Sequence, residues 1–250
     1  MTSIYFSGTG NTKFCAESFL SEMGGGAAVS IENPAALNTA AGDNDLLLAY
    51  PVYFSDIPII MRDFLTAHKS FFAGKNVFIL CTMTAFSGDG AGCGARFLRD
   101  CGANIIGGLH IIMPDCIADI KLFKKDEAAQ KLIIEKAEAK IAAAVKNYKN
   151  GKPPKNGMSF INMLGGLLIQ RIWCRRMIDN YAENLKIDSE KCIGCEICVK
   201  CCPMKNIETK DEKAFAKNRC TRCYRCINKC PKQAITLTGK AVVAQKKVEV

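Results

Sequence analysis

Eight of the fifteen cysteines follow one spacing, C-x2-C-x2-C-x3-C-P, which occurs twice near the C-terminus. The first copy is Cys192, Cys195, Cys198, Cys202 and Pro203, and the second is Cys220, Cys223, Cys226, Cys230 and Pro231. Each residue of the second copy lies 28 positions after its counterpart, and the same offset relates Ile187 to Phe215 and Ile207 to Ile235. The region is therefore an internal repeat.

Three thiolates at three-residue intervals surround one concave turn, whose backbone N–H groups can face inorganic sulfur. The pattern resembles that of bacterial ferredoxins with two [4Fe-4S] clusters, in which the fourth cysteine ligates the other cluster. The resemblance extends over roughly residues 183–240. It implies one cluster on Cys192, Cys195, Cys198 and Cys230, and a second on Cys220, Cys223, Cys226 and Cys202.

Other uses of these cysteines fit less well. Zinc sites usually pair two C-x2-C hooks and do not need a third cysteine at the same interval. A disulfide framework needs an oxidising compartment, and no signal peptide opens the chain, so we expect a cytoplasmic location. Oxygen-sensitive clusters would suit an anaerobic host. Cys201 lies beside Cys202 but is not followed by proline, so we expect it not to be a ligand.

Length and charge narrow the function classes. The 250 residues suffice for one domain with its own core and a second, smaller one. The apolar run Met163 to Ile169 is far shorter than the roughly 20 residues of a membrane helix. The net charge of +10 divides into −5 over residues 1–120, +7 over 121–185 and +8 over 186–250. No aromatic-interleaved groove accompanies the basic part, which favours protein redox partners with acidic docking surfaces over nucleic acid.

A second motif opens the chain. The apolar run Ser3 to Phe6 leads into Ser7, Gly8, Thr9, Gly10, Asn11 and Thr12, and then into the helical stretch Lys13 to Met23. A Gly- and hydroxyl-rich loop between a strand and a helix binds anions, because N–H groups converge at the helix N-terminus. No lysine stands in a G-K-[ST] arrangement, so the loop is not of the nucleoside-triphosphate type.

This loop resembles the phosphate-binding loop of flavodoxins, which holds FMN. The resemblance implies that two later loops at strand ends flank the flavin ring, with Tyr53 and Phe86 as its aromatic neighbours. The residues of these loops are Pro51, Val52, Tyr53, Phe54, Thr82, Met83, Thr84, Ala85, Phe86 and Gly88. The glycine-rich run from Gly88 to Gly94 is expected to be a flexible loop around the ring.

The remaining cysteines and the two histidines predict no catalysis. Cys15, Cys81, Cys93, Cys101, Cys116 and Cys174 lack ligand spacing, so buried apolar roles are expected. Cys81, just before the second flavin loop, has the alternative of lying beside the flavin. His68 and His110 are isolated in the sequence and are expected to be structural.

Alternating apolar segments predict the architecture. Strands are expected near residues 3–6, 28–31, 45–50, 76–81 and 104–113, and helices near 9–22, 57–67, 91–100 and 125–148. This α/β alternation predicts a flavodoxin-like, doubly wound, five-stranded parallel sheet in the order 2-1-3-4-5. A small α+β two-cluster ferredoxin-like domain follows. The predicted divisions are 1–148, 149–182 and 183–250.

The segment that joins the two domains contains both basic and apolar residues. Asn150 to Gly157 is expected to be an exposed linker. Met158 to Leu185 predicts a strap whose apolar side packs on the first domain, with a membrane-surface helix as the alternative. The apolar residues of this strap are Phe160, Leu164, Leu167, Leu168, Ile172, Trp173 and Met177, set against Arg171, Arg175 and Arg176.

Together, the two motifs resemble those of the flavodoxin–ferredoxin fusion family. The resemblance implies an electron-transfer protein that relays electrons between two [4Fe-4S] clusters and FMN. Two alternatives stay open: a flavin-dependent reductase of a small substrate that is fed by the clusters, and a ferredoxin with an FMN-free docking domain.

Overall fold

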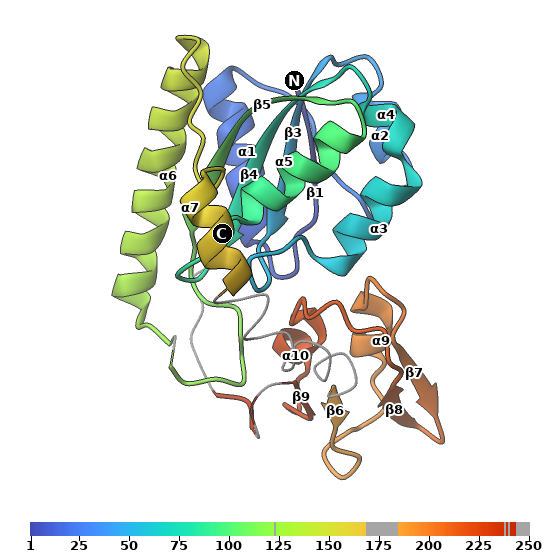
Figure 1. Ribbon diagram of the computed structural model, residues 1–250. Coiled ribbons are helices and arrows are strands. Elements are labelled where there is room, and N and C mark those ends of the chain that lie inside the picture. Colours follow the sequence, from blue (N-terminus) through green and yellow to red (C-terminus); the bar gives the residue numbers. More distant parts are fainter. Residues whose placement is uncertain (123, 169–184, 238, 240, 244–250) are drawn as a thin grey trace.

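The computed structural model describes residues 1–122, 124–168, 185–237, 239 and 241–243. Its first part is a five-stranded sheet in which every strand pair is parallel. The strands are β1 (Thr2–Tyr5), β2 (Ala28–Ser30), β3 (Asp45–Pro51), β4 (Asn76–Met83) and β5 (Asn104–Ile112). Their order is β2-β1-β3-β4-β5 (Figure 1). The predicted flavodoxin-like topology is therefore confirmed.

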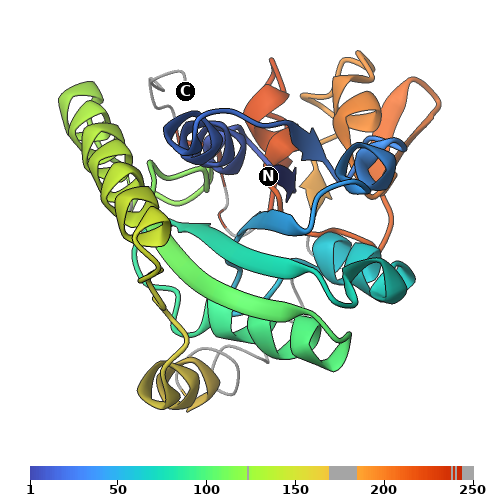
Figure 2. The same ribbon diagram turned by 90° about the horizontal axis from the view of Figure 1, so that it is seen from above.

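Helices cover both faces of this sheet, as its continuous apolar strands require. The helices are α1 (Asn11–Met23), α2 (Ala36–Ala40), α3 (Ile59–Ala67), α4 (Lys69–Phe72), α5 (Gly90–Asp100) and α6 (Glu127–Lys149). Phe19 of α1 and Ile141 of α6 pack with Leu47 on one face. Met61 of α3 and Leu98 of α5 pack on the other face (Figure 2).

The glycine-rich run after β4 is not the flexible loop predicted from its composition. Helix α5 begins at Gly90, and Gly90, Gly92 and Gly94 are all buried. A Cβ atom on Gly90 would overlap the Val52 side chain, and one on Gly94 would overlap the Tyr50 hydroxyl. These glycines let the helix approach its neighbours closely.

The segment after α6 differs from the exposed linker that we expected. Lys155 forms a parallel bridge with Gly108 of β5. The N–H of Gly108 donates to the Pro154 carbonyl at 2.8 Å, and the N–H of Asn156 donates to the Gly108 carbonyl at 2.8 Å. The second half of the segment therefore extends the edge of the sheet, because β5 leaves backbone groups there that need partners.

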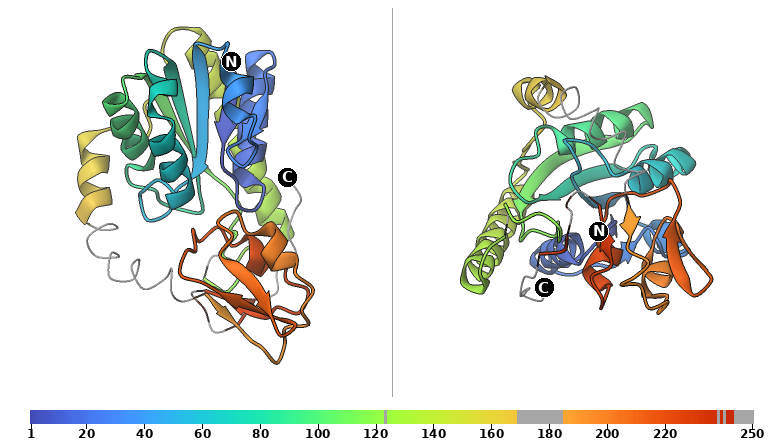
Figure 3. Two further views of the ribbon diagram at one scale, coloured as in Figure 1. Left: turned by 90° about the vertical axis from the view of Figure 1, so that its right-hand side faces the viewer. Right: turned by 90° about the horizontal axis from the view of Figure 1, so that it is seen from below.

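Helix α7 (Phe160–Gly165) contradicts the strap prediction within the described residues. Met158 packs against the first core cluster. However, Phe160 is 70% and Ile161 81% exposed, and α7 lies on the outside of the first domain (Figure 3). Leu164, Leu167 and Leu168 are exposed as well. The other predicted strap residues, Arg171, Ile172, Trp173, Arg175, Arg176 and Met177, lie outside the described residues.

The small domain consists of two short antiparallel pairs and two helices. The strands are β6 (Lys186–Ile187), β7 (Ile207–Lys210), β8 (Lys213–Ala216) and β9 (Ile235–Thr236), with β6 paired to β9 and β7 to β8. The helices are α9 (Ile197–Cys201) and α10 (Arg225–Lys229). This domain lies below the carboxyl ends of the first domain's strands in Figure 1. In the described ranges, no helix has the length and hydropathy needed to cross a membrane.

The sequence repeat is also a repeat of backbone conformation. Left-handed residues occur in pairs 28 positions apart. The φ values are 69° and 62° at Gly194 and Arg222, and 58° and 57° at Glu196 and Tyr224. Non-glycine residues seldom adopt this conformation. Alternation of left- and right-handed residues turns successive N–H groups toward one concave side, which suits an anionic group in each copy.

Candidate functional site

The predicted ligands form two rings of thiols in the small domain. One cavity is lined by Cys192, Cys195, Cys198 and Cys230, and a second by Cys202, Cys220, Cys223 and Cys226. Each ring takes three cysteines from one copy of the repeat and the fourth from the other. The structure thus places together the two sets that the ferredoxin resemblance implies.

Backbone N–H groups approach these sulfurs. The N–H of Asn206 donates to Cys202 Sγ, and that of Ala234 to Cys230 Sγ, both at 3.3 Å. Hydrogen bonds from the Ala214 and Gly194 backbones lower the pKa of the Cys192 thiol. Donors aimed at sulfur are what a thiolate-held cluster needs. Across the described residues, no three Cys, His, Asp or Glu side chains form a site for a single metal ion.

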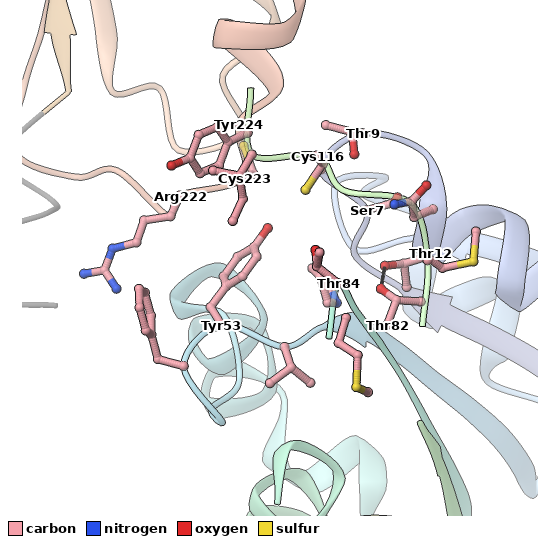
Figure 4. Close-up of a pocket in the computed structure, with 18 of the residues that line it drawn as sticks. Ser7, Thr9, Thr12, Tyr53, Thr82, Thr84, Cys116, Arg222, Cys223 and Tyr224 are labelled. Atoms are coloured by element: carbon pink, nitrogen blue, oxygen red, sulfur yellow. Dashed lines mark hydrogen bonds between the residues drawn. The ribbon is translucent and has the colours of Figure 1, made fainter. Parts of the chain in front are cut away.

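A larger cavity of about 280 Å³ lies where the two domains meet (Figure 4). Three of its walls are the loops singled out in the sequence. The predicted residues that line it are Ser7, Gly8, Thr9, Asn11, Thr12, Pro51, Val52, Tyr53, Phe54, Thr82, Met83 and Thr84. This end of the sheet, where the carboxyl ends of the strands meet, is where ligands bind in open α/β folds.

The polar end of the cavity is built around the start of α1. Gly10 has a φ of 112°, which lets the chain turn into the helix, and its N–H donates to Ser7 Oγ at 3.1 Å. The buried Thr12 and Thr82 hydroxyls lie 2.7 Å apart. No carboxylate is among the described lining residues. A helix N-terminus with hydroxyls and no opposing carboxylate fits a phosphate.

The rest of the cavity is mostly apolar. Val52, Met83 and Met113 line it, and Tyr53 reaches in from the loop after β3 toward Cys223 (Figure 4). Burial raises the pKa of the Tyr53 hydroxyl well above its usual value, so this group stays a neutral phenol. An apolar cavity with a polar end matches the polarity of a ring system that carries a phosphate chain.

Four predicted residues do not line the cavity. Phe86 is 59% exposed, and Ala85 is exposed beside it. Gly88 packs against Ser55 and Gly166. Gly10 does not line the cavity, but its backbone turns the chain into helix α1. The structure therefore brings Tyr53, but not Phe86, to the cavity.

Other lining residues were missed by sequence reasoning. They come from the loop after β5 and from the small domain, and they are Met113, Cys116, Ile117, Ile120, Arg222, Cys223, Tyr224 and Leu237. Cys116 was expected to be an inert core cysteine. Cys81, given the alternative of a place beside the flavin, is instead fully buried in the core and away from the cavity.

His110 is structural, as expected. Its Nε2 accepts the N–H of Ala91 at 3.2 Å, which leaves the ring proton on Nδ1, 2.7 Å from Ser87 Oγ. Burial lowers the pKa of His110 to about 4, so the ring is neutral at neutral pH. Both ring nitrogens are engaged in holding α5 against β5.

Arg225 connects the two domains beside the cavity. Its Nε donates to the Gly8 carbonyl at 3.1 Å, and one terminal nitrogen donates to the Ser7 carbonyl at 2.8 Å. The same guanidinium forms a bidentate pair with Glu32 at 2.6 and 2.8 Å, and this pair raises the pKa of Arg225. A fifth bond, to the Cys201 carbonyl at 3.2 Å, uses its last donor. The outward-facing carbonyls of the loop thus have a charged partner.

One family model matches the C-terminal part of the chain. Residues 184–231 match a family model described as a 4Fe-4S dicluster domain, which confirms the predicted ferredoxin-like region. No curated protein matches the chain significantly.

Several solved structures resemble the first part of the chain. Two-electron reduced flavodoxin from Megasphaera elsdenii is 24% identical, with 56% of this chain and 99% of that one covered and a TM-score of 0.41. A flavodoxin from the domain Archaea is 17% identical, with 58% of this chain and 99% of that one covered and a TM-score of 0.40. The flavodiiron protein from Giardia intestinalis is 12% identical, with 60% of this chain and 36% of that one covered and a TM-score of 0.40. Because these TM-scores lie below 0.5, the fold assignment rests on the observed strand order.

Proposed function

We propose that this chain is an electron-transfer protein that relays electrons between two [4Fe-4S] clusters and one FMN. The observation that carries the proposal is the position of Cys223, which lines both the second thiol ring and the large cavity between the domains. A single ligand side chain would then separate a cluster from the flavin. Residues 1–148 are the proposed FMN domain, 149–182 the connecting segment and 183–250 the cluster domain.

Each cofactor has a distinct set of residues in this proposal. When bound, FMN exchanges one or two electrons and a [4Fe-4S] cluster exchanges one. Ser7 to Thr12 would hold the phosphate through backbone N–H groups and hydroxyls. Val52, Met83 and Met113 would exclude water from the ring, and Tyr53 would lie against it. The two thiol rings would hold the clusters.

The two clusters would have different roles because their ligands differ in exposure. Cys223 and Cys226 are buried, whereas Cys195 of the other ring is exposed. The neighbouring Ile193 is 57% exposed, and Ile197 is exposed as well. Exposed apolar residues above a ligand loop suit a docking surface for a redox partner. The cluster on Cys195 would exchange electrons with the partner, and the cluster on Cys223 with the flavin.

A lysine-lined hollow beside the exposed ring supports an acidic partner. Lys186, Lys191 and Lys232 line it, with Asp188 as the carboxylate among the described lining residues. Lys191 forms an ion pair with Asp188 at 3.1 Å, and the excess of ammonium groups would attract acidic surfaces. We place this exchange in a reducing, cytoplasmic compartment, which oxygen-sensitive clusters require.

The cofactor content tests this proposal directly. After anaerobic purification, the chain should contain about eight iron, about eight sulfide and about one FMN, with both flavin and iron-sulfur absorbance. Iron and sulfide without flavin would reject the relay and make the first domain a docking scaffold. Flavin without iron would reject the cluster assignment.

A further inference from the structure

The two copies of the sequence repeat differ at several positions that line the thiol rings, and one of these differences adds a buried amide beside a ring. Asn206 follows Cys202 by four residues and lines the ring that contains Cys223. Its counterpart 28 positions later is Ala234, which lines the other ring. At this position, therefore, one cavity has an amide and the other a methyl group.

Three hydrogen bonds fix Asn206 in place. Its backbone N–H donates to Cys202 Sγ at 3.3 Å, and its carbonyl accepts the N–H of Lys217 at 2.8 Å. Its side-chain Oδ1 accepts the N–H of Arg219 at 2.6 Å. Because an N–H donates to one end of the amide, that end is the oxygen Oδ1, and the opposite end is the nitrogen Nδ2, which is a donor.

That nitrogen is buried and has no hydrogen-bond acceptor in the part of the chain that the structure describes. The whole residue has an exposed fraction of 0%. A buried amide N–H without an acceptor is costly, and native structures seldom contain one. The orphaned donor therefore indicates an acceptor that occupies the adjacent cavity.

We propose that Asn206 Nδ2 donates a hydrogen bond to a sulfur of the cluster held by Cys202, Cys220, Cys223 and Cys226. This inference rests on the proposed cluster ligands and assigns a tuning role that the cysteine pattern does not contain. A hydrogen bond to sulfur stabilises the more negative, reduced form of a cluster and raises its reduction potential. The methyl side chain of Ala234 offers no such bond to the other cluster.

The asymmetry has a direction. The bond from Asn206 makes the adjacent cluster a better electron acceptor than it would be without the amide, and this is the cluster whose ligand Cys223 lines the flavin cavity. Electrons that enter at the exposed Cys195 side would then move toward the flavin. The amide at this one position would thus favour transfer toward the flavin.

A redox titration of the full-length protein, followed by EPR, tests this role. N206A and N206L should each shift one of the two cluster potentials to a more negative value and leave the other in place. N206L keeps the number and branching of the side-chain heavy atoms and leaves no cavity, which separates loss of the donor from the opening of a cavity. Iron content close to that of the native chain shows that both clusters remain. Unchanged potentials with intact clusters would overturn the role of Asn206, whereas a native chain without iron and sulfide would instead reject the proposed function.

A spectroscopic measurement on the native chain keeps the proposal testable if both variants lose a cluster. Asparagine labelled with ¹⁵N only in its side-chain amide should give a nitrogen coupling in pulsed EPR of the reduced protein. Asn228 is the internal comparison, because its Nδ2 donates instead to the Cys116 and Tyr224 carbonyls at 2.9 and 2.8 Å. A coupling that N228A retains would support the bond from Asn206. Absence of any coupling, or its loss in N228A, would contradict the bond.

Discussion

Replacing Cys202 with alanine should remove about four of about eight iron atoms, whereas the same change at its neighbour Cys201 should remove none. Cys202 lines the thiol ring shared with Cys223. The Cys201 thiol lines neither ring and points to the Cys198 carbonyl, 3.7 Å away. Loss of one ligand exposes a cluster edge to exchange and hydrolysis, and the other ring keeps its own four thiols.

The two variants form a matched pair, because they make the same chemical change at adjacent positions. Iron and sulfide should be quantified after anaerobic purification, and the number of reducible clusters should be counted by EPR. Equal loss of iron in both variants would contradict the assignment of Cys202, and not Cys201, as the ligand. Loss of all iron in C202A would show that the two clusters do not assemble independently.

Replacing Gly8 with alanine should slow electron transfer between the domains while the clusters remain intact. A Cβ atom on Gly8 would lie 2.5 Å from the carbonyl oxygen of Cys223, which is rigid backbone of the second ring. The domains would have to move apart at the point where cluster ligand and phosphate loop meet. Because the rate of electron tunnelling falls with the distance between the cofactors, this separation should lower the rate.

The control for this variant is Gly42→Ala. No heavy atom lies within 4 Å of the position that a Cβ on Gly42 would occupy, so the rate should equal that of the native chain. Rapid-mixing reduction of the clusters, with the flavin followed by absorbance, gives the rate. A native rate in Gly8→Ala would show that this contact does not set the distance between the cofactors.

Local patterns were sufficient to predict both modules. The cysteines of each repeat follow one another closely in the sequence, and the structure groups Cys202 with the second repeat as the ferredoxin resemblance implies. The apolar runs around Leu47 and Phe78 are long enough to be buried on both faces, which predicts a parallel sheet with helices on both sides. The loop Ser7 to Thr12 follows the first strand directly.

Contacts between distant segments could not be predicted in this way. The exposed position of Phe86 and the place of Cys116 in the cavity depend on how the loops after β4 and β5 pack. The bonds from Arg225 to Ser7 and Gly8 join residues more than 200 positions apart. Asn206 was missed because its significance is visible only when its amide is seen to be buried without an acceptor.

In the proposed relay, cluster and flavin exchange electrons within one chain. A laser flash that reduces the clusters of the native protein, followed by flavin absorbance over a dilution series, tests it most directly. The relay predicts a first-order bleaching of the flavin whose rate does not change with protein concentration. A rate proportional to concentration, or no flavin bleaching after cluster reduction, would contradict it.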